Sequence, residues 1–567
     1  MTSTAQTSAT SSAPAAGPGG GFDAVTSPPP PHNEPVLGYA PGSPERATLE
    51  EALRSVLGEV AELPMTVGGE VRAASGEELE VRRPDAHAHV LARGRGATHA
   101  DAELALAAAR EAAPQWRRLP FDERAAVLLR AADLLSGPWR ARMNAATMLG
   151  QSKSAQQAEI DSACELADFW RFNVHYARQL LAEQPPRHSN GVWNRTDHRP
   201  LEGVVYAITP FNFTAIAGNL PTAPALLGNV VVWKPSPTQT LAAVLTMRLL
   251  REAGLPDGVV NLLPGDGLAV SDVMLAAPDL AGIHFTGSTA TFQHLWRGVA
   301  ENISGYHAYP RLVGETGGKD FVVAHPSADP DALVTALVRG AFEYQGQKCS
   351  AASRAYVPAS LWRAGVRDAL VATTESLTYG RVDDLSSFGG AVIDERSFAR
   401  NAAAIDRAHA EPGIDVLAGG THDRSEGWFV RPTVVEVADP ADEVFRTEYF
   451  GPVLAVHVWD DARPDGWRSM LEQMERVAPY ALTGAVFARD RYAVAEATAT
   501  LRFAAGNFYV NDKPTGAVVG QQPFGGGRAS GTNDKAGAVH NLLRWVSPRT
   551  LKETFVAPTD HTYPHMG

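Results

Sequence analysis

A cysteine and a glutamate are the residues best suited to covalent and acid–base chemistry in this sequence. Cys349 lies in the run Gln347 to Ser350, beside Lys348. A nearby cation lowers the pKa of a thiol and makes it a better nucleophile. The alternative is a small buried side chain, the usual role of a lone cysteine. Cys164, the other cysteine, lies in a segment expected to be helical and is assigned to packing, so the two form no disulfide framework.

Two further side chains could assist a nucleophile. Glu315 lies among glycines in the run 313–319, where the backbone can approach a ligand closely, and could act as a general base for water. A turn with a solvated glutamate is the alternative. Asn212, in the run 209–213, could donate its amide to a developing oxyanion. Asparagine also caps helices, and taken alone this residue favours the cap.

Several short motifs could hold a nucleotide, although each is weak alone. Each places a polar side chain or a glycine at the end of an expected strand or in a loop. They are Lys234, Ser236, the turn Gly287-Ser288, Glu448 and Phe450. Lysine and serine can donate to ribose and phosphate, a Gly-Ser turn can hold a pyrophosphate, and a glutamate can accept from ribose hydroxyls. The alternatives are a lysine extended toward solvent, a common turn and an ordinary loop. The glycine-rich run 521–527 could be a linker.

The elements that must position these residues follow an alternating pattern from Leu201 onward. Short β-branched runs at 204–208, 230–233, 259–263 and 283–285 alternate with helical stretches. This alternation predicts a parallel sheet, which binds dinucleotides at the carboxyl ends of its strands. A second alternating region from Phe321 past Val510 predicts a second α/β domain. Before Leu201, the segments 44–59, 99–114, 121–136 and 143–183 are expected to be helical.

Length and composition set the broad class. A chain of 567 residues is too long for one hydrophobic core, and its net charge of -13 disfavours nucleic-acid binding. No apolar run approaches the roughly 18 residues of a membrane span. Residues 1–33 are rich in Ala, Ser, Thr, Gly and Pro, which predicts a disordered tail. The chain has no Lys or Arg before Arg46, which is untypical of a transit peptide, so a cytoplasmic location is expected.

Taken together, these motifs resemble the aldehyde dehydrogenase superfamily in their order and spacing, including the 34 residues from Glu315 to Cys349. The likeness is closest to the monofunctional 1-pyrroline-5-carboxylate (L-glutamate γ-semialdehyde) dehydrogenases and covers nearly everything after Asn33. It rests on four runs, which are 210–216, 342–351, 506–513 and 521–535. The last two are specific to this branch.

The resemblance implies an α/β aldehyde dehydrogenase fold with three parts. A Rossmann-like NAD-binding domain is expected over 34–185 and 201–313, and an α/β catalytic domain over 314–515. A small β flap for oligomerisation is expected over 186–200 and 540–567. The implied partners are a small-molecule substrate and further copies of the chain, as a homodimer or a larger homo-oligomer. Neither a nucleic acid, nor a membrane, nor a metal ion is expected.

The resemblance also implies the reaction, which is NAD(P)-dependent oxidation of L-glutamate γ-semialdehyde to L-glutamate in proline degradation. Cys349 is then the nucleophile, Glu315 the base and Asn212 an oxyanion donor. The expected cofactor ligands are Lys234, Ser236, Gly287, Ser288, Glu448 and Phe450. The expected substrate ligands are Ser350, Gly516, Ala517, Phe213 and Phe524.

Two departures from the family pattern bear on specificity. Ala517 stands where relatives often carry serine, so one hydroxyl donor to the substrate carboxylate is missing. Pro237 stands where many NAD-preferring members of the superfamily place an acidic residue on the adenosine ribose. The absence of that acid removes a repulsion against a 2′-phosphate, so NAD is expected and NADP is also possible. Phe292, after the Gly-Ser turn, replaces a glycine in a manner shared by this branch.

Two other functions stay open on the sequence. One is an aldehyde dehydrogenase for another semialdehyde, such as succinate semialdehyde; the Gly516-Ala517 loop and the run 521–535 argue against it. The other is a non-catalytic relative, which is disfavoured because both Cys349 and Glu315 are present. Turnover of a panel of aldehydes separates these possibilities.

Overall fold

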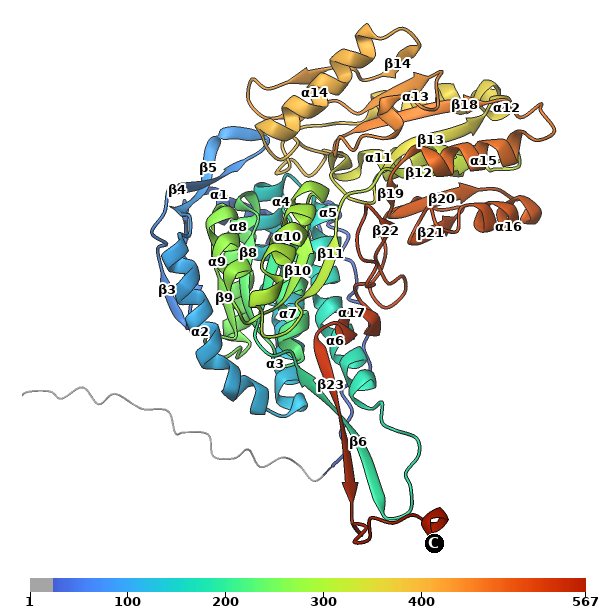
Figure 1. Ribbon diagram of the computed structural model, residues 1–567. Helices are drawn as coiled ribbons and strands as arrows, with labels where there is room; N and C mark the ends of the chain where they lie inside the picture. The colour runs from blue at the N-terminus through green and yellow to red at the C-terminus, as the bar shows by residue number, and fades with distance from the viewer. Residues whose placement is uncertain (1–23) are drawn as a thin grey trace, which may run out of the picture.

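The computed structural model describes residues 24–567, which form two α/β units and a projecting two-stranded ribbon (Figure 1). The predicted tail, residues 1–33, lies mostly outside the described residues. In its described part the Thr26 hydroxyl donates to Asp122, and the Asn33 amide donates to Asp168 at 2.8 Å. These contacts place residues 26–33 against the first α/β unit.

The first unit is built on a seven-stranded sheet of order β11-β10-β7-β8-β9-β2-β3. Its parallel strands are β7 (Val204–Thr209), β8 (Val230–Pro235), β9 (Val260–Leu262), β10 (Leu280–Thr286) and β11 (Arg311–Glu315). The antiparallel edge consists of β2 (Met65–Val67) and β3 (Glu70–Arg72). The four predicted strands and their parallel sheet are confirmed. The fifth parallel strand, which ends at Glu315, was not predicted because its glycines resemble a turn.

Helices connect and cover this sheet. The connecting helices are α7 (Thr214–Leu226), α8 (Thr240–Glu252), α9 (Leu268–Ala276) and α10 (Thr289–Glu301). The N-terminal helices are α1 (Pro44–Leu57), α2 (His99–Arg118) and α3 (Phe121–Ser136). The predicted end of α2 is wrong, because the helix continues through Pro114 to Arg118. Pro114 is exposed, so the carbonyl that loses its helical partner can bond to water.

The segment 143–183, expected to be helical, is helical over most of its length but not as one continuous helix. The chain forms α4 (Arg140–Gln151), α5 (Ala155–Ala158), the π-helical turn η1 (Glu159–Glu165) and α6 (Leu166–Leu181). The break begins at Ser152, whose φ is 58°. Lys153, directly after it, forms a buried ion pair with Asp161 at 2.6 Å. This pair holds the chain after α4 against η1.

A three-stranded sheet before α2 was also not predicted. It has the order β1-β5-β4 and consists of β1 (Ala61–Leu63), β4 (Glu78–Arg83) and β5 (Ala86–Arg95).

The second unit confirms the predicted second α/β region. Its seven-stranded sheet has the order β14-β17-β18-β13-β12-β20-β21, with only β14 antiparallel to its neighbour. The strands are β12 (Asp320–Ala324), β13 (Ala352–Pro358), β14 (Ile414–Ala418), β17 (Thr433–Val437), β18 (Val453–Trp459), β20 (Thr483–Phe487) and β21 (Asn507–Val510). The main helices are α11 (Pro330–Phe342), α13 (Arg367–Ser376), α14 (Glu395–Ala410), α15 (Gly466–Val477) and α16 (Arg491–Thr500).

The ribbon that extends from the first unit in Figure 1 pairs two distant segments. Strand β6 (Val192–Pro200) runs antiparallel to β23 (Val546–Thr554). The segment 540–567, expected to belong to a β flap, begins with a short helix, α17 (Val539–Leu543), and not with a strand. Trp545 is fully buried beside the His284 ring, with 4.7 Å between ring centroids. Its burial ends the ribbon at Val546.

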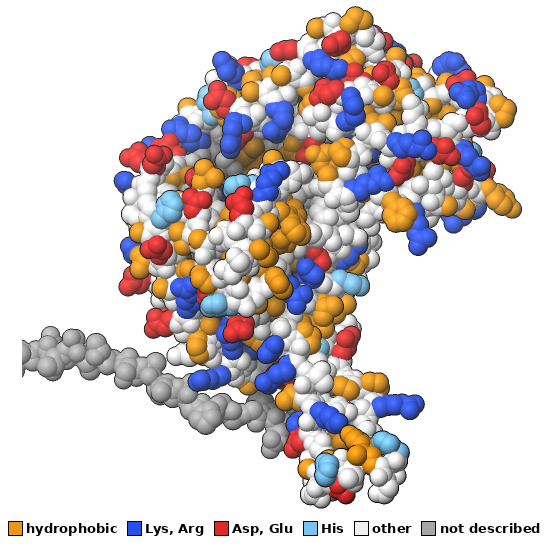
Figure 2. Space-filling view, viewed as in Figure 1, with side chains coloured by type: hydrophobic (Ala, Val, Ile, Leu, Met, Phe, Trp, Pro, Cys, Tyr) orange, Lys and Arg blue, Asp and Glu red, His pale blue; other side chains and the backbone are white. Residues whose placement is uncertain are grey.

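The surface carries charges of both signs. Figure 2 shows Lys and Arg side chains interspersed with Asp and Glu over the visible face. Among the described residues, no helix is long and apolar enough to cross a membrane.

Candidate active site

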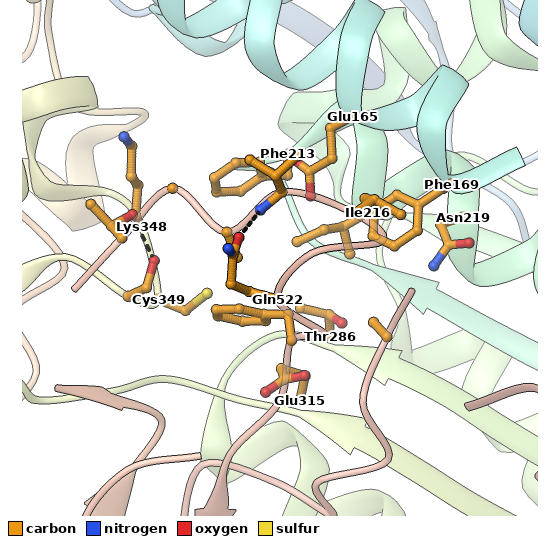
Figure 3. Close-up of a pocket in the computed structure, with 18 of the residues that line it drawn as sticks. Glu165, Phe169, Phe213, Ile216, Asn219, Thr286, Glu315, Lys348, Cys349 and Gln522 are labelled. Carbon is orange, nitrogen blue, oxygen red and sulfur yellow. Dashed lines mark hydrogen bonds between the residues drawn. The ribbon is translucent and has the colours of Figure 1, made fainter. Parts of the chain in front are cut away.

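A cavity of about 280 Å³ collects most of the predicted catalytic and substrate residues. Its lining includes Phe213, Glu315, Cys349, Ser350, Gly516, Ala517 and Phe524. In Figure 3 the Cys349 sulfur points into the space between Phe213 and Glu315. These residues come from both α/β units, so the two units together form the cavity.

The turn before Cys349 is strained and firmly held. Tyr344 and Gln345 have φ values of 53° and 54°, a left-handed conformation that costs free energy for side chains other than glycine. Gly346 follows at 66°, and an added Cβ would lie 2.3 Å from the Gly451 carbonyl oxygen. Gln345 compensates by donating to two buried carbonyls, those of Ser152 at 2.8 Å and Ala391 at 2.7 Å. The turn therefore fixes the position of the cysteine that follows.

The surroundings of the Cys349 thiol differ from the sequence-based interpretation. Burial raises the pKa of this thiol well above its usual range, and the nearby carboxylates, Glu315 foremost, raise it further. Lys348 does not counteract this effect, because its ammonium pairs with Glu343 at 3.1 Å. The predicted activation by the neighbouring lysine is therefore wrong. A base must accept the thiol proton when the sulfur reacts.

Glu315 is the last residue of β11 and is held by the glycine-rich loop that follows β21. Its Oε1 accepts from the Gly526 backbone N–H at 3.1 Å. Burial raises the pKa of this carboxyl to about 8, although the Gly526 N–H and the charge of Lys535 oppose the rise. Such a value suits a general base, which must release and take up protons near neutral pH.

The position before Glu315 is a glycine, Gly314, because the Phe292 ring leaves no room for a side chain there. This ring stacks on Phe285 with centroids 5.3 Å apart and covers Gly314, where an added Cβ would lie only 2.1 Å from the ring. The aromatic residue that replaces a glycine after the Gly-Ser turn thus packs under the strand that carries the base.

Asn212 lies behind the cavity wall, just before α7. It is buried, and its amide donates to the Gln347 carbonyl at 3.0 Å, two residues before Cys349. It does not cap α7, because the N-cap position is Phe213 and no side-chain oxygen accepts from the first turn of this helix. A primary amide carries two N–H groups, so one donor is left for a substrate oxygen.

A loop opposite the cysteine forms the distal end of the cavity. The Ser350 and Thr515 hydroxyls lie 2.8 Å apart and are hydrogen bonded, which joins the cysteine turn to this loop. Gly516 has a φ of 95° and Ala517 follows it on the lining. The loop offers backbone N–H groups in a conformation that requires glycine.

Four of the predicted cofactor residues lie at the carboxyl ends of β8 and β10, outside the lining of this cavity. Lys234 is the penultimate residue of β8, and burial lowers the pKa of its ammonium to about 8 while Nζ donates to the Gly265 carbonyl at 3.2 Å. Ser236 follows it, next to Thr238. Gly287 leads into α10, and Ser288 caps that helix by accepting from the Thr291 N–H at 3.1 Å. An ammonium, a hydroxyl and the start of a long helix form a donor set that fits a nucleotide.

Glu448 and Phe450 lie on the other side of Lys348, in a small adjoining recess. Glu448 accepts from the Gly318 N–H at 2.9 Å, and burial raises its pKa to about 7. An added Cβ on Gly317 would lie 1.9 Å from this carboxylate, so only glycine fits there. Phe450 has a φ of 53° and meets the edge of Phe211.

The sequence did not single out several residues of the cavity. Glu165, Phe169 and Lys513 line it, and burial raises the pKa of Glu165 to about 8. Glu165 and Phe169 are four apart, a helical spacing that signals a shared face but gave no reason to place it at the cavity. Cys164 lies in η1, buried beside Arg140, as the packing interpretation expected. Within residues 24–567, no cluster of His, Cys, Asp and Glu is placed to hold a metal ion.

Comparison with known proteins agrees with this geometry. The model of the aldehyde dehydrogenase family matches residues 71–551. The chain belongs to the aldehyde dehydrogenase family. It is 48% identical over 540 residues to the mitochondrial delta-1-pyrroline-5-carboxylate dehydrogenase of Dictyostelium discoideum, covering 95% of this chain and 96% of that protein. The human mitochondrial enzyme of the same name is 48% identical over 535 residues, with 94% of each chain covered.

Solved structures of the family have the same fold as this chain. A crystal structure of the delta-pyrroline-5-carboxylate dehydrogenase from Mycobacterium tuberculosis, bound with NAD, has a TM-score of 0.93 and 62% identity, and covers 96% of this chain and all of that one. A 1-pyrroline-5-carboxylate dehydrogenase from Thermus with bound NAD has a TM-score of 0.86 and 31% identity, over 93% of this chain and all of that one. The aldehyde dehydrogenase fold expected from the sequence is confirmed.

Proposed function

We propose that this protein oxidises L-glutamate γ-semialdehyde, the open form of 1-pyrroline-5-carboxylate, to L-glutamate with NAD, as a step of proline degradation. The observation that carries the proposal is the one cavity that joins Cys349, Glu315 and the Gly516-Ala517 loop. Relatives of this name at 48% and 62% identity support it. NADP stays an alternative cofactor because Pro237 places no acid near the adenosine ribose.

The reaction begins at the thiol of Cys349. The thiol releases its proton to solvent, and the sulfur, now a thiolate, bonds to the aldehyde carbon. The resulting oxyanion is held by the free N–H of the Asn212 amide and by the Cys349 backbone N–H. Removal of one such donor typically costs about 3–4 kcal/mol in the transition state. When bound, NAD supplies the acceptor for the hydride that leaves this carbon, which leaves a thioester on Cys349.

Hydrolysis of the thioester completes the cycle. Glu315 removes a proton from water as the water oxygen bonds to the thioester carbon. The carbon–sulfur bond then breaks, and Cys349 leaves as a thiolate that is reprotonated. The products are a carboxylate and the enzyme in its starting form.

The substrate carries a carboxylate and an ammonium, and the cavity offers a partner for each. The backbone N–H groups of Gly516 and Ala517 and the Ser350 hydroxyl are donors for the carboxylate. Lys513 adds a cation at the same end. The Glu165 carboxylate, on another wall of the cavity in Figure 3, can accept from the ammonium. Phe213 and Phe524 enclose the aliphatic carbons between these groups.

Lys234, Ser236, Gly287 and Ser288 are proposed to hold the nucleotide. Glu448 accepts from a ribose hydroxyl in this proposal, and Phe450 lies beside the nicotinamide ring. The corresponding domains are the NAD-binding domain over 34–185 and 201–313 and the catalytic domain over 314–515. The ribbon of β6 and β23, within 186–200 and 540–567, is proposed as the contact between copies in a homodimer or larger homo-oligomer. A cytoplasmic location stays a prediction, and the relatives from Dictyostelium discoideum and human are named mitochondrial.

The test is NAD reduction by the purified protein with 1-pyrroline-5-carboxylate, succinate semialdehyde and propanal, each also run with Cys349→Ala. We expect a strong preference for 1-pyrroline-5-carboxylate and no activity in the variant. Equal or better turnover of another aldehyde would keep the chemistry and reject this substrate. Full activity of Cys349→Ala would reject the nucleophile.

A further inference from the structure

Lys535 lies beside the candidate base and has no part in the reaction as described so far. Its Nζ donates to three oxygen atoms, those of the Gly506 carbonyl at 2.8 Å, the Gly525 carbonyl at 2.9 Å and the Asn507 side chain at 3.2 Å. The backbone of Lys535 has a φ of 50°, an unfavourable conformation for lysine. Such a conformation persists only where the surrounding contacts enforce it.

These bonds join Lys535 to the loop that holds Glu315. The Gly525 carbonyl and the Gly526 N–H belong to one peptide group, and that N–H donates to Glu315 at 3.1 Å. The Asn507 side-chain oxygen accepts from the Gly525 N–H at 3.2 Å as well as from Lys535. The loop is closed by a pair of backbone hydrogen bonds between Phe524 and Ala536, at 2.8 and 3.0 Å. The peptide group that binds the base is thus fixed through the lysine ammonium.

We propose that Lys535 is a positioning residue for the hydrolytic half of the reaction, which orients the 525–526 peptide toward Glu315 and favours the ionised form of that side chain. The proposal rests on the proposed function, in which Glu315 activates water. The Lys535 ammonium attracts the Glu315 carboxylate electrostatically, and both are hydrogen bonded to the 525–526 peptide group. Each therefore favours the charged form of the other.

The charges around Glu315 support this role and provide a counterpart. The charge of Lys535 lowers the pKa of Glu315, while the Asp534 carboxylate raises it. Asp534 itself is partly neutralised by Arg544 at 3.4 Å and accepts from the Thr532 hydroxyl at 2.5 Å. The Cys349 thiol faces the same carboxylate from the other unit. Lys535 and Asp534 carry opposite charges, so they should shift the pKa of Glu315 in opposite directions.

The experiment compares Lys535→Met, Lys535→Arg and Asp534→Asn with the wild-type enzyme. It uses whichever aldehyde of the panel is turned over fastest, so it does not depend on the substrate assignment. The measured quantities are the first-turnover burst of NADH, the steady-state kcat against pH, and the melting temperature. Glu315→Gln is run beside them.

We expect Lys535→Met to lower steady-state kcat about tenfold at neutral pH and to keep or enlarge the first-turnover burst of NADH. The rise of kcat with pH should move to higher pH in this variant. Lys535→Arg should retain most of the wild-type kcat, and Asp534→Asn should move the rise of kcat to lower pH. Folded Lys535→Met with an unchanged profile, or equal profiles in the variants of Lys535 and Asp534, would overturn the proposal. If Lys535→Met does not fold, the direction of the shift in Asp534→Asn and the recovery in Lys535→Arg decide it. Normal turnover by Glu315→Gln would instead reject the function on which it rests.

Discussion

The Glu315 carboxylate accepts a hydrogen bond from the Gly526 backbone N–H, although 211 positions separate the two residues. The first ends a strand of one α/β unit, and the second belongs to a loop that follows the last strand of the other. The base is therefore held by a part of the chain that follows the strands of both sheets in the sequence and lines the cavity between the two units.

This environment predicts how turnover depends on pH. Burial raises the pKa of Glu315 to about 8, so the neutral carboxyl predominates below that pH and the base form appears as the pH rises through it. We therefore expect steady-state kcat to increase between about pH 7 and pH 9. Glu315→Gln should lower kcat by about 10²- to 10⁴-fold at about pH 9, where the base form predominates, which is the usual contribution of a general base. A pH profile that falls over this range would contradict the assignment, and a conserved melting temperature is the control for folding.

Lys234 predicts a pH dependence of opposite sign for cofactor binding. Burial lowers the pKa of its ammonium to about 8, so the charged donor is present below that pH and is lost as the pH rises above it. We expect the rise in melting temperature on adding NAD to shrink above about pH 8. A ligand at 100 times its Kd stabilises by about 2.7 kcal/mol, which is measurable by thermal unfolding. In Lys234→Met, NAD should raise the melting temperature only slightly at all pH values. A rise in that variant equal to the wild-type value would remove Lys234 from the cofactor site.

The order of the motifs was sufficient to assign the chemistry. Cys349, Glu315 and Asn212 are weak signals when taken alone, and their roles were predicted from the resemblance to aldehyde dehydrogenases, whose order and spacing they share. Periodicity also found the four central strands, since buried parallel strands consist of short β-branched runs. The strand pattern is local, so each of these strands can be recognised from its own few residues.

The features that were missed depend on contacts between distant segments. Lys348 was expected to activate its neighbour, but the left-handed turn at Tyr344 and Gln345 brings its ammonium to Glu343 instead. Glu165 faces the cavity because η1 is π-helical, a local widening that no spacing rule indicates. The segment 143–183, expected to be helical, is interrupted at Ser152, where the stability of a buried ion pair outweighs helix propensity.

That ion pair predicts a large effect on stability. Lys153 and Asp161 are both 1% exposed and lie 2.6 Å apart, and Asp161 also accepts from the Thr214 and Ala215 N–H groups. Removal of one partner leaves a buried charge, which typically costs about 3–5 kcal/mol. We expect Lys153→Met to lower the free energy of unfolding by this amount in denaturant titration.

The matched control for that variant is an exposed ion pair. Arg463 and Asp465 are 60% and 62% exposed, so Arg463→Ala should cost about 1 kcal/mol or less. Equal losses in the two variants would show that the buried pair has no special role. The Lys153 ammonium also lies 4.0 Å from the centre of the Phe213 ring, which lines the cavity. Lys153→Met should therefore also raise KM for the substrate.

Ala517 predicts a gain of affinity by substitution. It lines the end of the cavity where the carboxylate is proposed to bind, next to Gly516 and across from Ser350. A serine there would add a hydroxyl donor, and a hydrogen bond to a charged group contributes about 1.5–3 kcal/mol. We expect Ala517→Ser to lower KM for 1-pyrroline-5-carboxylate about tenfold with little change in kcat, because the carboxylate is bound equally in the ground and transition states. Propanal has no carboxylate and is the internal control, so its KM should not change. A parallel fall in both KM values would mean that the hydroxyl acts on the cavity in general, and an unchanged KM for 1-pyrroline-5-carboxylate would place the carboxylate elsewhere.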